Sequence, residues 1–127
     1  MKYLSSDEII EINKIVTRLS GGSAGLRDAG LLASIVVKPR TSFGGVDMYP
    51  DNYLKAGILF EAIVNYHVFV DGNKRTAFAS MVRFLAINEY SMDVTDREIV
   101  DFTILVATKK LDMTEIANWV KAHTKKI

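Results

Sequence analysis

The residues best suited to chemistry lie close together in the middle of the 127-residue chain, between His67 and Arg75. His67 is one of only two histidines, and an imidazole can exchange a proton near neutral pH. Asp71 can hold Mg²⁺ through one carboxylate while the phosphates of a ligand supply further oxygen atoms. Gly72 permits a tight turn or a close approach of the backbone. This segment is therefore the first candidate for a functional site.

Basic residues follow at the point where a helix is expected to begin. Asn73, Lys74 and Arg75 open this helix, although positive charge opposes the dipole at a helix N-terminus. A bound anion would compensate, because the free N–H groups of a helix N-terminus bind anions. Arginine binds phosphate through two hydrogen bonds and lysine binds it as a point charge. A base, a metal ligand and an anion site together indicate phosphoryl or nucleotidyl transfer.

Each of these residues also has an ordinary structural explanation when it is taken alone. A lone histidine at a helix end is usually a cap or a half-buried hydrogen-bonding residue, and Asp-Gly is a common turn signal. Lys74 and Arg75 alone would be solvated surface residues. Phe69 is expected in the core, where it anchors the loop. The functional interpretation depends on the combination of these residues in one short segment.

Six helices are expected to position this segment, and three of them begin with the capping-box spacing. On the first helix, apolar residues are expected on one inward face. These residues are Ile9, Ile12, Val16 and Leu19. The six helices are expected from Ser5 to Gly21–Gly22, from Asp28 to Val37, from Asp51 or Asn52 to the loop that follows His67, from Asn73 to Asn88, from Asp96 to Lys109, and from Asp112 onward.

The segment Arg40–Pro50 interrupts the helical pattern. Its two glycines and the prolines at or near its edges are typical of an exposed loop or a short β-hairpin. The basic tail Lys121–Ile127 is expected to be a solvated helix end whose lysines complement the helix dipole. The predicted fold is therefore all-α, a compact six-helix domain with a short β-hairpin flap, and residues 1–127 are expected to form a single domain.

Composition excludes several classes of protein. The chain has no cysteine, which excludes disulfides and thiolate metal sites. Its net charge of +1 is small for a dedicated DNA-binding protein, so no direct contact with nucleic acid is expected. The apolar runs are too short for a membrane span and the N-terminus has no signal-peptide pattern. We therefore expect a cytoplasmic protein that does not contact a membrane.

The segment His67–Ala77 resembles the signature of the Fic/Doc superfamily, in which His-x-Phe is followed by Asp or Glu, Gly or Ala, and Asn. Its Asn-Lys-Arg-Thr-Ala sequence is similar to the Doc branch rather than to Fic proteins. Fic proteins have Gly in place of Lys74 and a second Arg in place of Phe78, and Val68 replaces a Pro that is common in the family. Four upstream stretches also resemble Doc-like toxins, namely Gly25–Asp28, Leu31–Leu32, Pro39–Arg40 and Phe43–Gly45.

The resemblance implies a role for each residue of the segment. His67 would be the general base that deprotonates a target hydroxyl, Asp71 would bind Mg²⁺, and Phe69 would anchor the loop. The phosphates of ATP would be held by Gly72, Asn73, Lys74 and Arg75. The flap would align a segment of the target protein by strand-like pairing through Phe43, Gly44, Gly45 and Val46.

The resemblance also implies a biological role. The chain would be the toxin of a type II toxin–antitoxin pair, a phosphotransferase that moves the γ-phosphoryl group of ATP to a Ser or Thr hydroxyl of a protein such as a translation elongation factor. Fic proteins often carry an inhibitory helix with the pattern Ser/Thr-x-x-x-Glu-Gly/Asn, and this chain has no such pattern. Inhibition would then come from a cognate antitoxin that folds on binding.

Three other interpretations remain open. The protein could be an adenylyltransferase or another nucleotidyltransferase, which would use the same base and cation. It could be a non-catalytic interaction module whose loop binds an anion. A metal hydrolase is a further option, but His67 and Asp71 are only two plausible ligands, and His123 lies in the tail.

Overall fold

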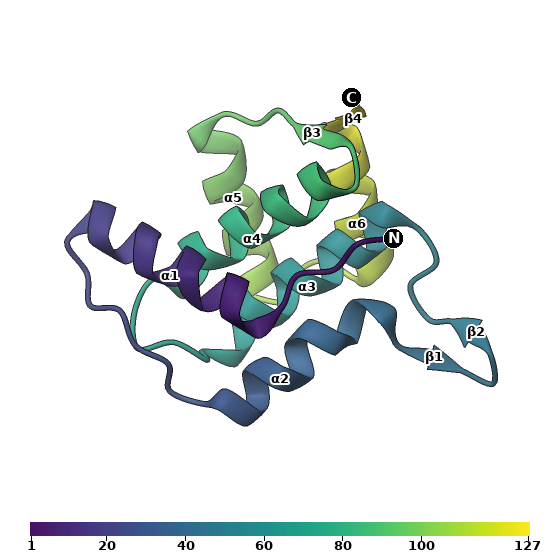
Figure 1. Cartoon of the computed structure of the whole chain (residues 1–127). Coiled ribbons are helices and arrows are strands. Elements are labelled where there is room, and N and C mark those ends of the chain that lie inside the picture. Colours follow the sequence, from purple (N-terminus) through teal and green to yellow (C-terminus); the bar gives the residue numbers. More distant parts are fainter.

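The computed structural model describes residues 1–127 and consists of six α-helices and two small antiparallel sheets (Figure 1). This confirms the predicted all-α fold with a short hairpin. None of the helices combines the length and the apolar composition that a membrane span requires. The helices are α1 (Ser6–Ser20), α2 (Ala29–Val37), α3 (Asn52–Tyr66), α4 (Asn73–Ile87), α5 (Asp96–Ala107) and α6 (Met113–Ala122), and a 3₁₀ turn (Lys38–Arg40) follows α2. The strands are β1 (Ser42–Phe43), β2 (Val46–Asp47), β3 (Tyr90–Met92) and β4 (Thr124–Lys126).

Helix α3 lies at the centre of the molecule, between α4, α6 and α2 (Figure 1). Its residues are buried almost continuously from Lys55 to Val64, as expected for a helix that is enclosed by others. A Cβ atom on Gly57 would lie 2.8 Å from Cγ2 of Ile116, so this glycine allows α6 to approach α3 closely. Because α3 is held on several sides, the residues at its C-terminal end have a fixed position.

The predicted hairpin is present between α2 and α3 and projects from the body of the molecule (Figure 1). Gly44 and Gly45 form its turn with φ angles of 59° and 79°, which a two-residue turn of this kind requires. The side chains of Phe43 and Val46 are 84% and 69% exposed. Buried Lys55 holds the base of the hairpin, because its Nζ donates to the carbonyl of Pro39 at 2.8 Å and lies 3.4 Å from Oδ2 of Asp47.

The C-terminal tail differs from the prediction of a solvated helix end. Helix α6 ends at Ala122, and Thr124–Lys126 form β4, which pairs with β3. Nδ1 of His123 lies 2.8 Å from the carbonyl oxygen of Trp119, and its Nε2 lies 3.1 Å from a carboxylate oxygen of Glu98. The prediction failed because Thr-Lys-Lys has no apolar alternation, so the strand forms only through backbone pairing with a segment far away in the sequence.

The inward face of α1 also differs from the prediction. Ile9 is buried, as expected, but Leu19 is 82% exposed. The fully buried positions further along the helix are the polar residues Asn13 and Thr17. The apolar pattern was misleading because Asn13 and Thr17 contact the polar end of the α3–α4 loop and the first turn of α4, at Asp71, Gly72 and Thr76.

Glu98 supports both the start of α5 and the C-terminal tail. The backbone N–H of Thr95 donates to its carboxylate at 2.8 Å, and this bond, with the neighbouring His123, lowers the pKa of Glu98. The ionised carboxylate therefore stabilises the fold above about pH 4.3, and this stabilisation is lost as the pH falls through the lowered pKa. We expect Glu98→Ala to unfold at a lower urea concentration than the parent at pH 7, and the difference to shrink towards pH 3. A difference that stays constant over this range would contradict the assignment.

Candidate active site

The loop between α3 and α4 begins at His67, which ends α3 in a left-handed conformation with φ 50° and ψ 48°. Histidine is one of the few residues other than glycine that enter this region with some frequency. The side chain is exposed. The ring of His67 makes no hydrogen bond within the protein, in contrast to the ring of His123, which makes two. Both ring nitrogens of His67 are therefore available to a substrate.

The next residues of the loop are anchored in the core. Val68 and Phe69 are 0% and 1% exposed. Their backbone pairs with the segment that precedes α2, because Arg27 N–H donates to the Val68 carbonyl at 2.7 Å and Val70 N–H donates to the Gly25 carbonyl at 2.8 Å. The upstream stretch Gly25–Asp28 thus belongs to the framework of the site.

Asn73 connects the end of the loop with its beginning. Its side-chain Oδ1 accepts from Phe69 N–H at 3.0 Å, and its Nδ2 donates to the Phe69 carbonyl at 3.0 Å. The amide of Asn73 therefore holds the loop, and what it offers to a phosphate is its backbone N–H at the start of α4.

The N-terminus of α4 has no side-chain cap. Gly72 is its N-cap residue with φ 73°, and the first backbone bond of the helix runs from Thr76 N–H to the Gly72 carbonyl at 2.8 Å. The first turn contains Lys74 and Arg75 and no acidic residue. Its N–H groups are thus open to an anion. The other five helices are capped by side chains, those of Ser5, Asp28, Asp51, Thr95 and Asp112.

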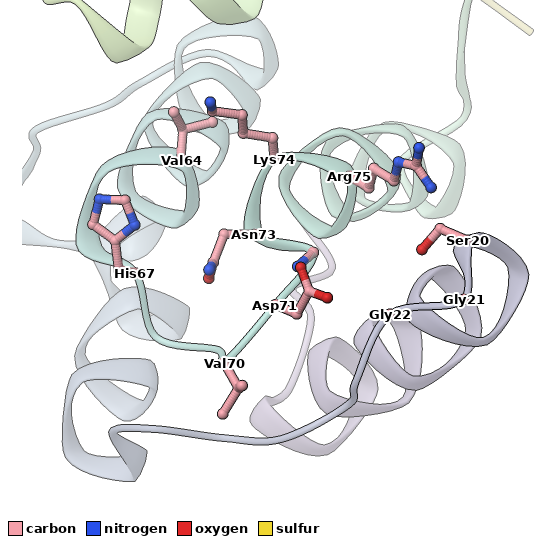
Figure 2. A pocket seen from close by; sticks show the side chains of 11 residues that line it. Ser20, Gly21, Gly22, Val64, His67, Val70, Asp71, Asn73, Lys74 and Arg75 are labelled. Atoms are coloured by element: carbon pink, nitrogen blue, oxygen red, sulfur yellow. The ribbon is translucent and has the colours of Figure 1, made fainter.

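These residues surround one pocket of about 650 Å³, in which the structure brings together six predicted residues (Figure 2). His67 lies on one side, Asn73 lies between His67 and Asp71, and Lys74 and Arg75 point to different sides of the opening (Figure 2). The pocket is lined by Ser20, Gly21, Gly22, Val64, His67, Val70, Asp71, Gly72, Asn73, Lys74 and Arg75.

Asp71 presents its carboxylate in this pocket. Its Oδ1 accepts from Gly72 N–H at 2.8 Å, and its Oδ2 accepts a longer bond of 3.3 Å from Ser23 N–H. A Cβ atom on Gly22 would overlap this carboxylate, so a larger residue there would require the Asp71 side chain to move. No group of three or more potential metal-binding side chains exists in the protein. A single carboxylate fits Mg²⁺ that arrives with phosphates, and it fits the resident metal of a hydrolase poorly.

The hairpin residues do not line the pocket. The hairpin precedes the N-terminal end of α3, whereas His67 follows its C-terminal end (Figure 1). The 15-residue helix that lies between them in the chain is roughly 22 Å long at 1.5 Å per residue. A role of Phe43, Gly44, Gly45 and Val46 in aligning a target therefore stays a prediction.

Two residues that support the pocket were missed in the sequence. Nδ2 of Asn13 donates to the Asp71 carbonyl at 2.9 Å, and the methyl group of Thr17 would lie 2.9 Å from a Cβ atom on Gly72. The only signal for these residues was their spacing, since two polar residues four positions apart interrupt the apolar pattern of α1.

An apolar groove of about 610 Å³ adjoins the pocket. It lies between α1, α4 and α5, and Lys74 and Arg75 line both the groove and the pocket. Its other lining residues are Val16, Phe78, Ala79, Asp96, Ile99, Val100, Thr103 and Ile104.

Comparisons with known proteins relate the chain to one family. The model described as "Fic/DOC family" matches residues 3–85, which include the whole α3–α4 loop. "Toxin Doc" of Mycolicibacterium smegmatis is 36% identical over 118 residues, which cover 91% of this chain and 88% of that protein. "Protein kinase doc" of Escherichia phage P1 is 27% identical over 124 residues, which cover 95% of this chain and 94% of that protein.

Gly72 and Gly21 allow the packing of the loop to be tested. Both have a left-handed backbone, with φ 73° and 76°, but a Cβ atom at Gly72 would meet Thr17 and one at Gly21 would have no neighbour within 4 Å. We expect Gly21→Ala to cost about 1 kcal/mol. Gly72→Ala should cost about 1–3 kcal/mol more, because it also overpacks the contact with α1. Urea denaturation measures both values, and equal losses would show that α1 does not restrict the loop.

Proposed function

This chain belongs to the Fic/DOC family, and we propose that it is a toxin of a type II toxin–antitoxin pair that phosphorylates a protein in the cytoplasm. In this proposal it moves the γ-phosphoryl group of ATP to a Ser or Thr hydroxyl of a target such as a translation elongation factor. The observation that supports it most is the pocket in which a free imidazole, an open carboxylate and an uncapped helix N-terminus lie together. The names of the two relatives point in the same direction.

His67 serves as the general base in this reaction. It takes the proton of the target hydroxyl while the hydroxyl oxygen forms a bond to the γ-phosphorus atom. The bond from this phosphorus to the β–γ bridging oxygen breaks, and ADP leaves. The exposed ring suits this role, because no internal hydrogen bond occupies its nitrogens.

The opposite side of the pocket binds the phosphates. Asp71 would hold Mg²⁺, which neutralises phosphate charge when it is bound. The backbone N–H groups of Asn73, Lys74 and Arg75 point out of the helix end, and the side chains of Lys74 and Arg75 add two positive charges. These groups stabilise the charge on the transferring phosphoryl group and on the leaving diphosphate.

Phosphoryl transfer is favoured over adenylyl transfer by two positions of α4. Lys74 stands where Fic proteins have glycine, so a side chain with its own charge fills the space beside the phosphates. Phe78 stands where Fic proteins have a second arginine, and it is half-buried against the core and faces the neighbouring groove. The pocket thus lacks the second guanidinium of a Fic-like triphosphate site, and the terminal phosphate becomes the one that is attacked.

The apolar groove suits an antitoxin segment that folds on binding. Val100 and Ile104 are each 54% exposed on its α5 side, as expected for a groove that accepts the apolar face of a helix. A segment in the groove would contact Lys74 and Arg75, which also line the pocket. It would therefore compete with the nucleotide phosphates for the same two cations.

The position of the transferred label tests the proposed reaction. The purified protein is incubated with a bacterial lysate and with ATP labelled at either the α or the γ phosphate. We expect label on a protein target from γ-labelled ATP only, with a mass gain of one phosphate. Arg75→Ala should weaken this transfer more than Lys74→Ala, because only arginine binds phosphate through two bonds. Arg83→Ala, on the same helix and outside the pocket, is the control that should retain activity.

Label from the α position would overturn the kinase proposal and support adenylyl transfer. Lys74→Gly alone should not convert one activity into the other, because Phe78 would still lack a guanidinium group.

Substitution of His67 tests the general base. His67→Ala should lower transfer by about 10²–10⁴-fold. His67→Asn is the better-matched variant, since asparagine tolerates the left-handed backbone at this position. Both variants should also abolish the growth arrest that we expect when the parent protein is expressed without an antitoxin. His123→Gln is the control that should keep activity. Near-parental transfer by His67→Asn would show that His67 is not the general base.

A further inference from the structure

We propose that Asn13 of α1 is a positioning residue for the cation site, because it fixes the main chain of Asp71 and thereby aims the Asp71 carboxylate into the pocket. This inference rests on the proposed function, in which Asp71 holds Mg²⁺. It concerns a residue that lies far from the loop in sequence and outside the lining of the pocket.

Asn13 is buried, with an exposed fraction of 1%, and both hydrogens of its amide are used. Nδ2 donates to the Asp71 carbonyl at 2.9 Å and to Oγ1 of Thr76 at 3.0 Å. One side chain thus connects α1 with the loop and with the first turns of α4. A buried amide of this kind is stable only while its partners stay in place, because an unpaired buried polar group costs about 1–3 kcal/mol.

Asp71 has few other restraints. Its carboxylate accepts only backbone N–H groups, one of them at 3.3 Å from Ser23, and the residue is exposed. The clamp made by Asn73 acts on Phe69, two residues earlier. The bond from Asn13 is therefore the one that holds the peptide carbonyl of Asp71 itself. Without it this peptide can rotate, and the carboxylate turns with it.

Thr17, one turn after Asn13, brings α1 close to the same end of the loop. The Thr17 hydroxyl donates to the backbone carbonyl of Asn13 at 2.7 Å, so the Thr17 methyl group faces Gly72. A Cβ atom on Gly72 would lie only 2.9 Å from this methyl group. Helix α1 and the loop thus lie close together at this point, beside the hydrogen bond from Asn13 to the Asp71 carbonyl.

Residues that orient a metal ligand usually change metal affinity by about 10–100-fold when they are removed. A purely structural residue would instead change the stability of the whole pocket, with or without metal. The positioning role and the purely structural role can be distinguished by one ratio, the Mg²⁺-dependent factor, which is the affinity for the nucleotide with Mg²⁺ divided by the affinity without Mg²⁺. This factor compares two affinities of the same variant, so a general loosening of the pocket cancels.

The test uses calorimetric titration of the full-length protein with the non-hydrolysable β,γ-imido analogue of ATP, once with excess Mg²⁺ and once with EDTA. Asn13→Leu, which has a similar size and no donor, should reduce the Mg²⁺-dependent factor by at least about 10-fold. Its affinity for the analogue in EDTA should stay near that of the parent. Thr76→Val is the matched control, because it removes the other partner of the same amide and leaves the bond to Asp71 in place. Its Mg²⁺-dependent factor should be that of the parent.

An unchanged factor in Asn13→Leu, measured below its unfolding temperature, would overturn the proposal. An equal loss in Thr76→Val would overturn it as well, since the amide would then act through the fold alone. If the affinity of the parent protein for the analogue does not change with Mg²⁺, the assignment of a cation site at Asp71 is wrong. Asn13→Ser carries the same expectations if Asn13→Leu does not fold. Binding of the analogue does not depend on transfer, so failure of the γ-label experiment and failure of this inference can be told apart.

Discussion

The pocket depends on the two hydrogen bonds between the Asn73 amide and the backbone of Phe69. They close the loop and keep Phe69 in the core, so that His67 and Asp71 lie on either side of a residue whose backbone is fixed. They also hold the Asn73 side chain against the loop, while Gly72, the N-cap residue, has no side chain that could cap the backbone N–H groups that follow. Asn73 thus shapes the loop, and Gly72 leaves the start of α4 open.

This open helix end has an electrostatic cost in the free protein. Each cation in the first turn of a helix is unfavourable by about 0.3–1 kcal/mol, and α4 carries Lys74 and Arg75 there with no acidic residue. The other five helices have side-chain caps, so the absence of a cap is local to the pocket. An anion that binds the N–H groups removes this cost, and the protein should therefore gain stability from phosphate ligands as well as affinity for them.

The sequence predicted those parts of the structure that local interactions determine. The expected capping boxes form, because each needs only a Ser, Thr or Asp and a Glu three residues later. The hairpin turn follows from Gly44–Gly45 in the same way. The β3–β4 pair, the exposed Leu19 and the buried Asn13 depend instead on segments that are far apart in the chain. The pocket residues from His67 to Arg75 are nearly contiguous, so their grouping was predicted, whereas the contribution of Ser20–Gly22 and the support by α1 required the structure.

The distance between the hairpin and His67 also restricts the shape of any protein that contacts both. An extended segment that spans a distance like the roughly 22 Å length of the 15-residue helix α3 takes about seven residues at 3.3 Å each. A target protein that contacts both the hairpin and His67 would be selected by the distance between its hairpin-binding segment and the hydroxyl that is modified. The composition of the residues directly beside that hydroxyl would then matter less, and unrelated sequences of the same span would be equivalent substrates.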